Sequence, residues 1–219
     1  MPSRADLDDL IARAQAGEPR AFEQLVAGHI GQVRRYARAL APREADADDL
    51  AQEALLKVHR SLRSFRYQAA FTTWLFAVVR TTFLDLARSA SRRGVERSLV
   101  EADAQAPAGA PLADEQLADA QERERVWAAL RQVPLEFRSA LVLFDLEGHS
   151  YDEVAVIEGI PVGTVRSRLS RGRAQLRRLL EAADAAVALA EAPPPEGATA
   201  TQPGTFADGA ASHLGRSRP

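Results

Sequence analysis

Apolar residues recur three and four positions apart along most of the chain, and the strict alternation expected of a strand is nearly absent. This spacing predicts an all-α protein in which each helix buries one apolar face. Pro42, Pro134, Gly148 and the segment 159–161 interrupt the pattern and separate the predicted elements. The helices are expected over residues 6–15, 19–41, 45–63, 72–93, 114–131, 135–146, 150–158 and 161–182.

Two segments hold too few large apolar residues to build a core. Residues 94–118 contain two prolines and have a net charge of −4, which is typical of a flexible acidic linker. Residues 185–219 are rich in Ala, Gly, Thr and Pro and are predicted to form a disordered tail. The expected organisation is therefore two small helical domains, residues 1–93 and 119–184, joined by the linker and followed by the tail.

The composition excludes several classes of protein. The chain of 219 residues has no cysteine and four scattered histidines, so we expect neither disulfides nor a metal site. Phosphate-binding loops and catalytic triads are also lacking, which predicts a protein without a cofactor or enzymatic activity. His149 lies in a predicted turn, where we expect a capping or solvent-exposed residue. No apolar run approaches the ~20 residues of a membrane span, and the N-terminus lacks an apolar secretory core, so we expect a cytoplasmic protein without membrane insertion.

The second domain has the element order of a helix-turn-helix. Ser150 and Glu153 have the spacing of a capping box, with Ser at the N-cap and Glu three residues later. Gly159 is expected to end this short helix, and a longer one begins near Pro161. A short helix, a tight turn containing glycine and a longer helix are typical of the DNA-binding motif.

The longer helix carries six arginines and no acid between Val162 and Leu180, whereas residues 119–161 carry nine acids and four arginines. On a helical projection, small residues lie opposite the apolar side, and arginines flank them. A helix in the major groove needs this arrangement, because small residues let base edges approach while cations face the phosphates. An ordinary solvated arginine face is the simpler alternative, which the missing acids disfavour. The small residues are Gly163, Ser167, Ser170 and Ala174, flanked by Arg166, Arg173 and Arg177 on one rim and by Arg168, Arg171 and Arg178 on the other.

Six aromatic residues lie between Phe65 and Phe83 and alternate with arginines, although aromatic residues make up only 6% of the chain. Rings among cations suit a single nucleic-acid strand, whose bases stack while its backbone follows the positive charge. Helical spacing also allows these rings to be core, and we favour that interpretation for Trp74 and Phe76. Loop residues 64–71 are the better candidates for binding.

Acidic residues three and four positions apart form a strip on the helix predicted over 45–63. Asp46, Asp49 and Glu53 lie opposite the apolar stripe that contains Leu50 and Val58. A strip of acids repels DNA, so we expect this one to face a protein. A solvated face with favourable charges at the helix start is the alternative.

Three segments, in this order, resemble the bacterial RNA polymerase sigma factors of the extracytoplasmic-function (ECF) branch of the sigma-70 family. Residues 46–53 (DADDLAQE) are similar to the polymerase-binding motif of that family. Residues 65–88 are similar to the segment that opens and reads the minus-ten promoter element, and residues 151–176 to the reader of the minus-thirty-five element. The resemblance covers residues 7–182. Tyr67 stands where the family usually has Gly, and Thr81 where it usually has Asn.

The resemblance implies a transcription initiation factor that binds core RNA polymerase and promoter DNA, with an anti-sigma factor as a further partner. For the minus-thirty-five element, the resemblance implies that Thr164, Arg166, Ser167 and Arg171 contact bases or lie close to them. Arg168, Arg173 and Arg177 are implied phosphate contacts. The implied polymerase contacts are Asp46, Asp49, Gln52 and Glu53; the minus-ten contacts are Phe65, Arg66, Tyr67, Phe71, Trp74, Arg80 and Arg88; and the minus-thirty-five contacts are Thr164, Arg166, Ser167, Arg168, Arg171, Arg173 and Arg177.

Two other classes of protein remain as alternatives. A stand-alone helix-turn-helix regulator would end in a similar domain, but residues 1–93 show neither a phosphorylation pocket nor the pattern of a ligand cavity. A decoy that sequesters an anti-sigma factor need not keep DNA contacts, yet Arg166, Ser167 and Arg171 are all present.

Overall fold

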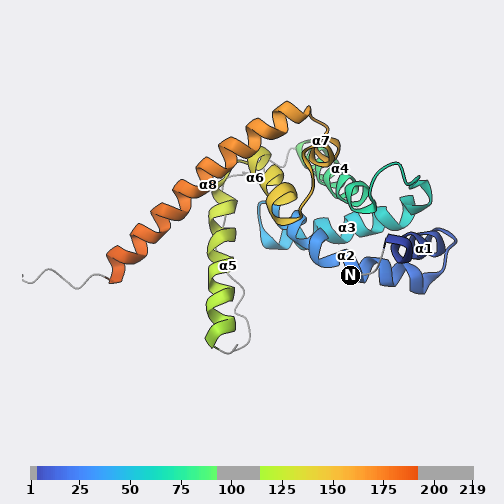
Figure 1. Ribbon diagram of the computed structural model, residues 1–219, viewed down its shortest axis with the longest axis horizontal. Coiled ribbons are helices and arrows are strands. Elements are labelled where there is room, and N and C mark those ends of the chain that lie inside the picture. Colours follow the sequence, from blue (N-terminus) through green and yellow to red (C-terminus); the bar gives the residue numbers. More distant parts are fainter. Residues whose placement is uncertain (1–3, 93–113, 192–219) are drawn as a thin grey trace, which may run out of the picture.

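The computed structural model describes residues 4–92 and 114–191, and every regular element within these ranges is helical (Figure 1). This confirms the all-α prediction. The linker predicted over 94–118 lies largely outside the described residues, as does the part of the predicted tail from residue 192 onward.

The first domain is a group of four helices around one apolar core. Helix α2 packs against both α1 and α3, and α3 packs against α4. Tyr36 and Phe76 are the largest side chains fully buried at the centre of the core, and their rings meet edge to face with centroids 5.2 Å apart. The helices are α1 (Arg4–Gln15), α2 (Pro19–Leu40), α3 (Glu44–Ser61) and α4 (Phe71–Arg92), with one 3₁₀ turn at Leu62–Ser64.

The second domain places a helix-turn-helix on two supporting helices. The predicted capping box is present: the Glu153 amide donates to the Ser150 hydroxyl, and the Glu153 carboxylate accepts from the Ser150 amide. Gly159 ends the short helix with φ +67°, a left-handed conformation that glycine adopts without steric cost. The helices are α5 (Asp114–Gln132), α6 (Leu135–Leu141), which continues as a π-helical turn over Val142–Leu146, α7 (Tyr151–Glu158) and α8 (Val162–Glu191).

Helix α8 is longer than predicted. We expected it to end at residue 182 and the tail to begin at 185, but the helix continues to Glu191. Residues 182–190 contain six alanines, the residue with the highest helix propensity, and Pro193 follows shortly after. The many alanines of this segment suggested that it could not form a core, but the same residues favour a longer helix.

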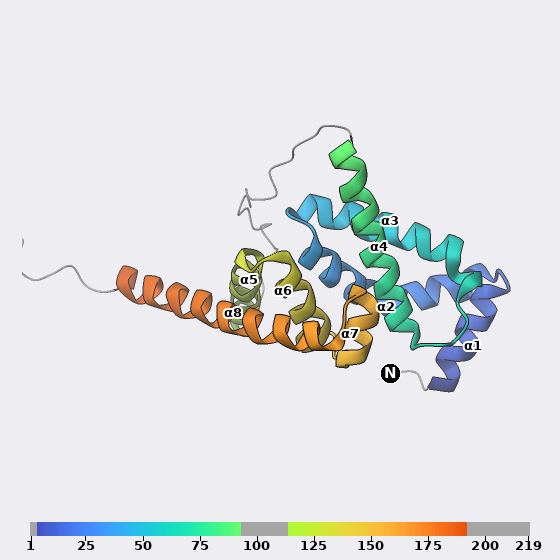
Figure 2. The same cartoon turned by 90° about the horizontal axis from the view of Figure 1, so that it is seen from above.

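The two domains pack directly against each other. Helix α7 packs against α4, and α6 packs against α2 (Figures 1 and 2). The buried apolar residues of both domains form one continuous cluster. As a result, the first helix of the helix-turn-helix rests on the helix that carries the predicted minus-ten contacts.

Candidate nucleic-acid and polymerase interfaces

Helix α8 presents the predicted small-residue strip to solvent. Val165 and Leu169 are buried against the rest of the domain, while Gly163, Ser167, Ser170 and Ala174 are all exposed. Gly172 lies on the buried side, where a Cβ would come within 3.0 Å of the Leu141 side chain on α6. Because this side of α8 packs closely on α6, the opposite side of the helix faces solvent.

Most of the predicted arginines line this face. The Arg166 guanidinium lies 5.4 Å from the centre of the Tyr151 ring, and Arg173 lies over Phe144 while donating to Asp145 from Nε at 3.1 Å. Ring and carboxylate partners orient both side chains along the rim of an open groove. The groove is lined by Tyr151, Arg166, Leu169, Ser170, Arg173, Ala174 and Arg177.

Arg168 differs from its neighbours on α8. Its side chain is half-buried, and Nη1 lies 3.5 Å from the Glu158 carboxylate at the junction of the two domains. We predicted this arginine on an exposed rim. The structure turns it inward because Glu158, at the end of α7, offers a buried acceptor.

The aromatic loop is divided between core and surface. Phe65 and Phe71 are buried, with their rings in contact with each other and with Trp74. They form the support of the loop, and only Arg66 and Tyr67 among its predicted contacts are exposed. Phe76 is fully buried, as predicted for a core ring.

Tyr67 occupies a conformation that suits glycine. Its φ is +57°, the single positive value among the non-glycine residues that the structure describes. The ring packs on Phe65 with centroids 4.9 Å apart, yet the residue keeps 46% of its surface exposed. Partial burial and the Asp8 carboxylate raise the pKa of the phenol, which therefore stays a neutral donor. Glycine would adopt this conformation without steric cost, and Tyr67 instead places a ring on the outer side of the loop.

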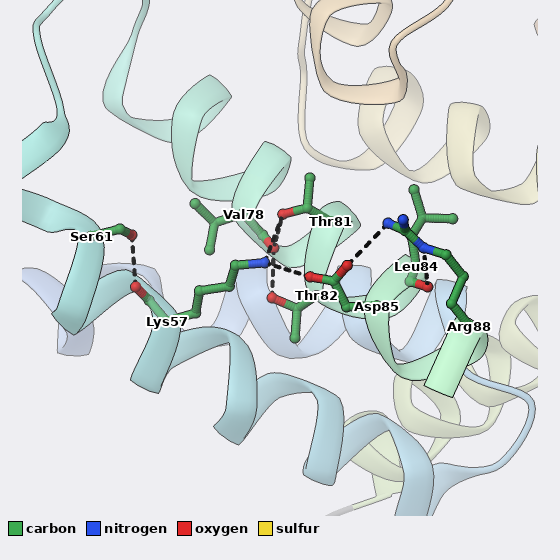
Figure 3. Close-up of polar contacts among 8 residues, drawn as sticks. All are labelled: Lys57, Ser61, Val78, Thr81, Thr82, Leu84, Asp85 and Arg88. Carbon is green, nitrogen blue, oxygen red and sulfur yellow. Dashed lines mark hydrogen bonds and ion pairs between the residues drawn. The ribbon is translucent and has the colours of Figure 1, made fainter. Parts of the chain in front are cut away.

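A polar cluster joins α3 to the outer face of α4 (Figure 3). Lys57, the single lysine of the chain, donates to Asp85 at 2.8 Å, and Arg88 donates to the other oxygen of the same carboxylate at 3.0 Å. The hydrogen bond from Lys57 is the main cause that lowers the pKa of Asp85. Thr81 lies 3.5 Å from the Lys57 ammonium. Arg88 is thus held on the exposed surface of α4 by an ionised carboxylate.

Arg80 lies on the other side of α4, away from this cluster. Its guanidinium is largely buried and forms an ion pair with Glu158 at 3.2 Å. Of the predicted minus-ten arginines, Arg66 and Arg88 are open to solvent, and Arg80 faces the second domain.

The acidic strip on α3 is exposed on the face away from the core. Asp49, Gln52 and Glu53 are open to solvent, and Leu56 is an exposed apolar residue one turn further on. Asp46 is partly buried and accepts both hydrogen bonds of a bidentate pair with Arg43. The acids of the strip are therefore on an outer face, as the spacing predicted, with one exposed apolar side chain beside them.

Sequence reasoning missed the polar residues between the domains. Tyr36, Ser139 and Glu158 form a buried hydrogen-bonded group, and Thr73 of α4 donates to Glu153 of α7 at 2.9 Å. His149 was predicted to be a capping or solvent-exposed residue, and it is instead buried against Phe76, with ring centroids 4.9 Å apart. A buried tyrosine hydroxyl needs a partner, but the sequence alone does not show which one.

Within the described ranges, no group of three or more potential ligand side chains is placed to hold a metal ion. None of the helices in these ranges is both long and apolar enough to cross a membrane.

The fold is that of a protein with two helical domains, the second of which contains a helix-turn-helix. Residues 25–93 match the family model for sigma-70 region 2, and residues 123–176 match the model for sigma-70 region 4. The chain belongs to the sigma-70 family, in its ECF branch. It is a transcription initiation factor of that class, so the prediction made from the three sequence segments is confirmed.

Proteins with similar sequences are named ECF sigma factors. The ECF RNA polymerase sigma factor SigE of Mycolicibacterium smegmatis is 39% identical over 166 residues, which span 76% of this chain and 63% of that protein. SigM of Mycobacterium tuberculosis is 37% identical over 177 residues, 78% of this chain and 83% of the relative. The ECF sigma-E factor of Escherichia coli K12 is 34% identical over 75% of this chain and 88% of its own length.

Two solved structures share the fold. RpoE from Bartonella quintana, solved with the anti-sigma factor NepR, superposes with a TM-score of 0.60 at 30% identity, covering 73% of this chain and 96% of that one. CnrH, solved with the cytosolic domain of CnrY, gives a TM-score of 0.57 at 30% identity, covering 79% and 96%.

Proposed function

We propose that this chain binds core RNA polymerase through the outer face of α3 and directs it to promoters read by α8 and by the aromatic loop. The supporting observation is the exposed strip of small residues on α8, flanked by arginines and fixed in rotation by the contact between Gly172 and α6. The protein does no covalent chemistry in this role and acts in the cytoplasm, where polymerase and DNA meet.

Each of the two DNA surfaces has a separate task. On α8, Thr164, Arg166, Ser167 and Arg171 read base edges of the minus-thirty-five element in duplex form. Arg173 and Arg177 hold phosphates at the rim of the groove, which positions the helix without reading sequence. In the first domain, Arg66 and Arg88 hold the backbone of the minus-ten strand, and the ring of Tyr67 stacks on an unpaired base.

An anti-sigma factor is the further partner we propose. The two structural neighbours support this, because RpoE was solved with an anti-sigma factor and CnrH with the cytosolic domain of CnrY. A partner of this kind regulates the protein by covering one or both of its interfaces.

Reconstituted transcription tests the proposal. Core polymerase, with and without the full chain, is given DNA from upstream of the coding region of this protein, and run-off RNA is measured. We expect a discrete transcript that appears only when the chain is present. DNA binding by the chain alone, with no effect on polymerase, would instead identify a stand-alone regulator.

A further inference from the structure

The junction between the two domains centres on one buried carboxylate. The Glu158 side chain is fully buried and accepts hydrogen bonds from Tyr36 of α2 at 3.0 Å and from Ser139 of α6. It also forms an ion pair with Arg80 of α4 at 3.2 Å. Arg168 of α8 lies 3.5 Å from the same oxygen that pairs with Arg80. Two of these partners belong to the first domain, so the carboxylate is fully partnered only when the domains are together.

The arginines on this carboxylate come from both DNA-reading helices. Arg80 is a predicted minus-ten contact and Arg168 a predicted minus-thirty-five contact, and both guanidinium groups approach Oε2 of Glu158. Promoter elements named for positions 10 and 35 lie about 25 base pairs apart, which is roughly 85 Å along B-form DNA. Two side chains that contact the same oxygen atom cannot, at the same time, contact two promoter elements that lie this far apart. The structure is therefore a closed form that has to open before both elements are read.

The closed form leaves Arg80 poorly satisfied. Its Nε and Nη1 atoms are buried and have no hydrogen-bond partner among the described residues. A buried donor without a partner costs free energy that a stable structural pair would not carry. Arg80 is thus held at the junction while keeping donors for a different acceptor, such as a phosphate.

Further polar contacts cross the junction beside the continuous apolar cluster. Arg35 of α2 donates to Glu147 at 2.7 Å, Arg38 donates to Glu124 of α5 at 2.7 Å, and Thr73 donates to Glu153. The Arg38–Glu124 pair is partly exposed, and exposed ion pairs contribute little. The Glu147 side chain is itself buried, while its partner Arg35 is exposed. The buried group around Glu158 is the part of the junction whose loss leaves a charge uncompensated.

We propose that Glu158 is an intramolecular latch, which holds this sigma factor closed by occupying one arginine from each DNA-reading helix. Release of the latch frees Arg80 and Arg168 together, so opening and promoter binding are coupled through the same two side chains. The latch needs no second protein. This inference rests on the proposed function, and it takes Arg80 and Arg168 as DNA contacts from the family resemblance, whereas the closed state itself rests on the contacts alone.

The chain length permits the opening. Residues 93–113 connect α4 to α5, and a segment of this length reaches about 70 Å when fully extended. The lengths of α4 and α8, which carry the DNA contacts, add to the distance that the segment can span. The connection is therefore long enough for both promoter elements to be contacted at once.

A distance measurement on the full chain tests the latch. The protein has no cysteine, so Gln24→Cys on α2 and Glu136→Cys on α6 give one attachment site for a spin label in each domain, both at exposed positions. We expect a short, narrow distance distribution in the otherwise unchanged chain. Glu158→Gln keeps the size of the side chain but removes its charge, and is expected to raise the ratio of open to closed molecules about tenfold.

Two further variants separate the latch from a folding defect. Tyr36→Phe removes one donor from the opposite domain while keeping the ring against Phe76, and should open the chain in the same direction. Glu18→Gln removes an acid of the same kind that pairs with Arg13 inside the first domain, and should leave the distances unchanged. A distribution that stays short in both Glu158→Gln and Tyr36→Phe would overturn the latch, as would a broad, long distribution in the parent chain.

Transcription with core polymerase distinguishes failure of the latch from failure of the proposed function. Opening in Glu158→Gln, with run-off transcription equal to or above that of the parent, supports both. Unchanged distances with normal transcription would reject the latch alone. Opening as expected, in a chain that never supports transcription, would leave the latch in place and reject the proposed function.

Discussion

The His149 imidazole meets the ring of Phe76 edge to face, with centroids 4.9 Å apart, and this contact joins the turn before α7 to the centre of α4. The Nε2 atom of His149 is buried without a hydrogen-bond partner among the described residues, while Nδ1 lies 3.7 Å from the Glu153 carboxylate. Burial lowers the pKa of His149, and the charges of Glu153 and Glu147 oppose that effect only in part. The closed form therefore favours the neutral imidazole.

Acidification should open the chain. In the open form the ring loses the cover of Phe76, and its pKa returns toward the ordinary value of about 6.5. Protons then bind the open form preferentially, so the contribution of His149 to closure is complete above pH ~6.5 and is lost as the pH falls below it. The spin-label distances measured between pH 8 and pH 5.5 should lengthen toward the acidic end.

A non-titrating variant is the control for this pH dependence. His149→Gln removes the ionisable group and should flatten the response between pH 8 and pH 5.5. Identical pH curves for the parent and His149→Gln would assign the effect to the surrounding carboxylates and contradict the role of the histidine.

Charge reversal on the acidic strip should abolish binding to core polymerase. Asp49→Lys with Glu53→Lys changes two exposed residues of α3 that have no core contact, so helical content should not change. Reversed charges at an interface cost several kcal/mol, which predicts at least about a hundredfold weaker binding. Co-purification with core polymerase measures this, and Glu23→Lys on the exposed part of α2 is the matched control. Wild-type affinity in the double variant would remove the strip from the account.

Tyr67 should stabilise the melted promoter. Stacking of a base on a ring is worth about 1–3 kcal/mol, so Tyr67→Gly should lower the stability of the open complex five- to hundredfold. Tyr67→Phe keeps the ring and should retain most of that stability. Permanganate footprinting on a closed promoter, compared with transcription from a preopened one, separates melting from polymerase binding.

The stability of the first domain is a second property that Tyr67→Gly should change in a predictable way. Glycine accepts φ +57° without the steric cost that tyrosine carries, so Tyr67→Gly should not destabilise the first domain as a simple loss of core contact would. A variant that melts closed promoters as well as the parent would show that the ring faces solvent without function.

Local pattern was enough to predict most of the fold. The capping box of Ser150 and Glu153 and the left-handed Gly159 depend on residues a few positions apart, and the structure has them as expected. The exposed small strip of α8 also follows from helical periodicity alone. Features of this kind are encoded within a single element, and a single sequence therefore reveals them.

The junction between the domains could not be predicted in the same way. Glu158 resembles a solvated acid at the end of a short helix, and its partners Tyr36 and Ser139 lie 122 and 19 residues away. The inward turn of Arg80 and Arg168 follows from that distant packing. The burial of Phe65 and Phe71 likewise depends on Trp74 closing over the loop, which spacing alone did not reveal.

The most direct test of the account is run-off transcription by core polymerase and this chain over a complete set of single-base changes in the minus-thirty-five element. Arg171→Ala is expected to relax the preference at one position, where a good bidentate contact is worth about 1–3 kcal/mol, whereas Arg177→Ala should weaken every sequence alike. Both residues are exposed on α8, so each variant is the control for the other. The account predicts a preference lost at one base pair in Arg171→Ala only. Uniform weakening in both variants, with the base preferences of the parent retained, would contradict it.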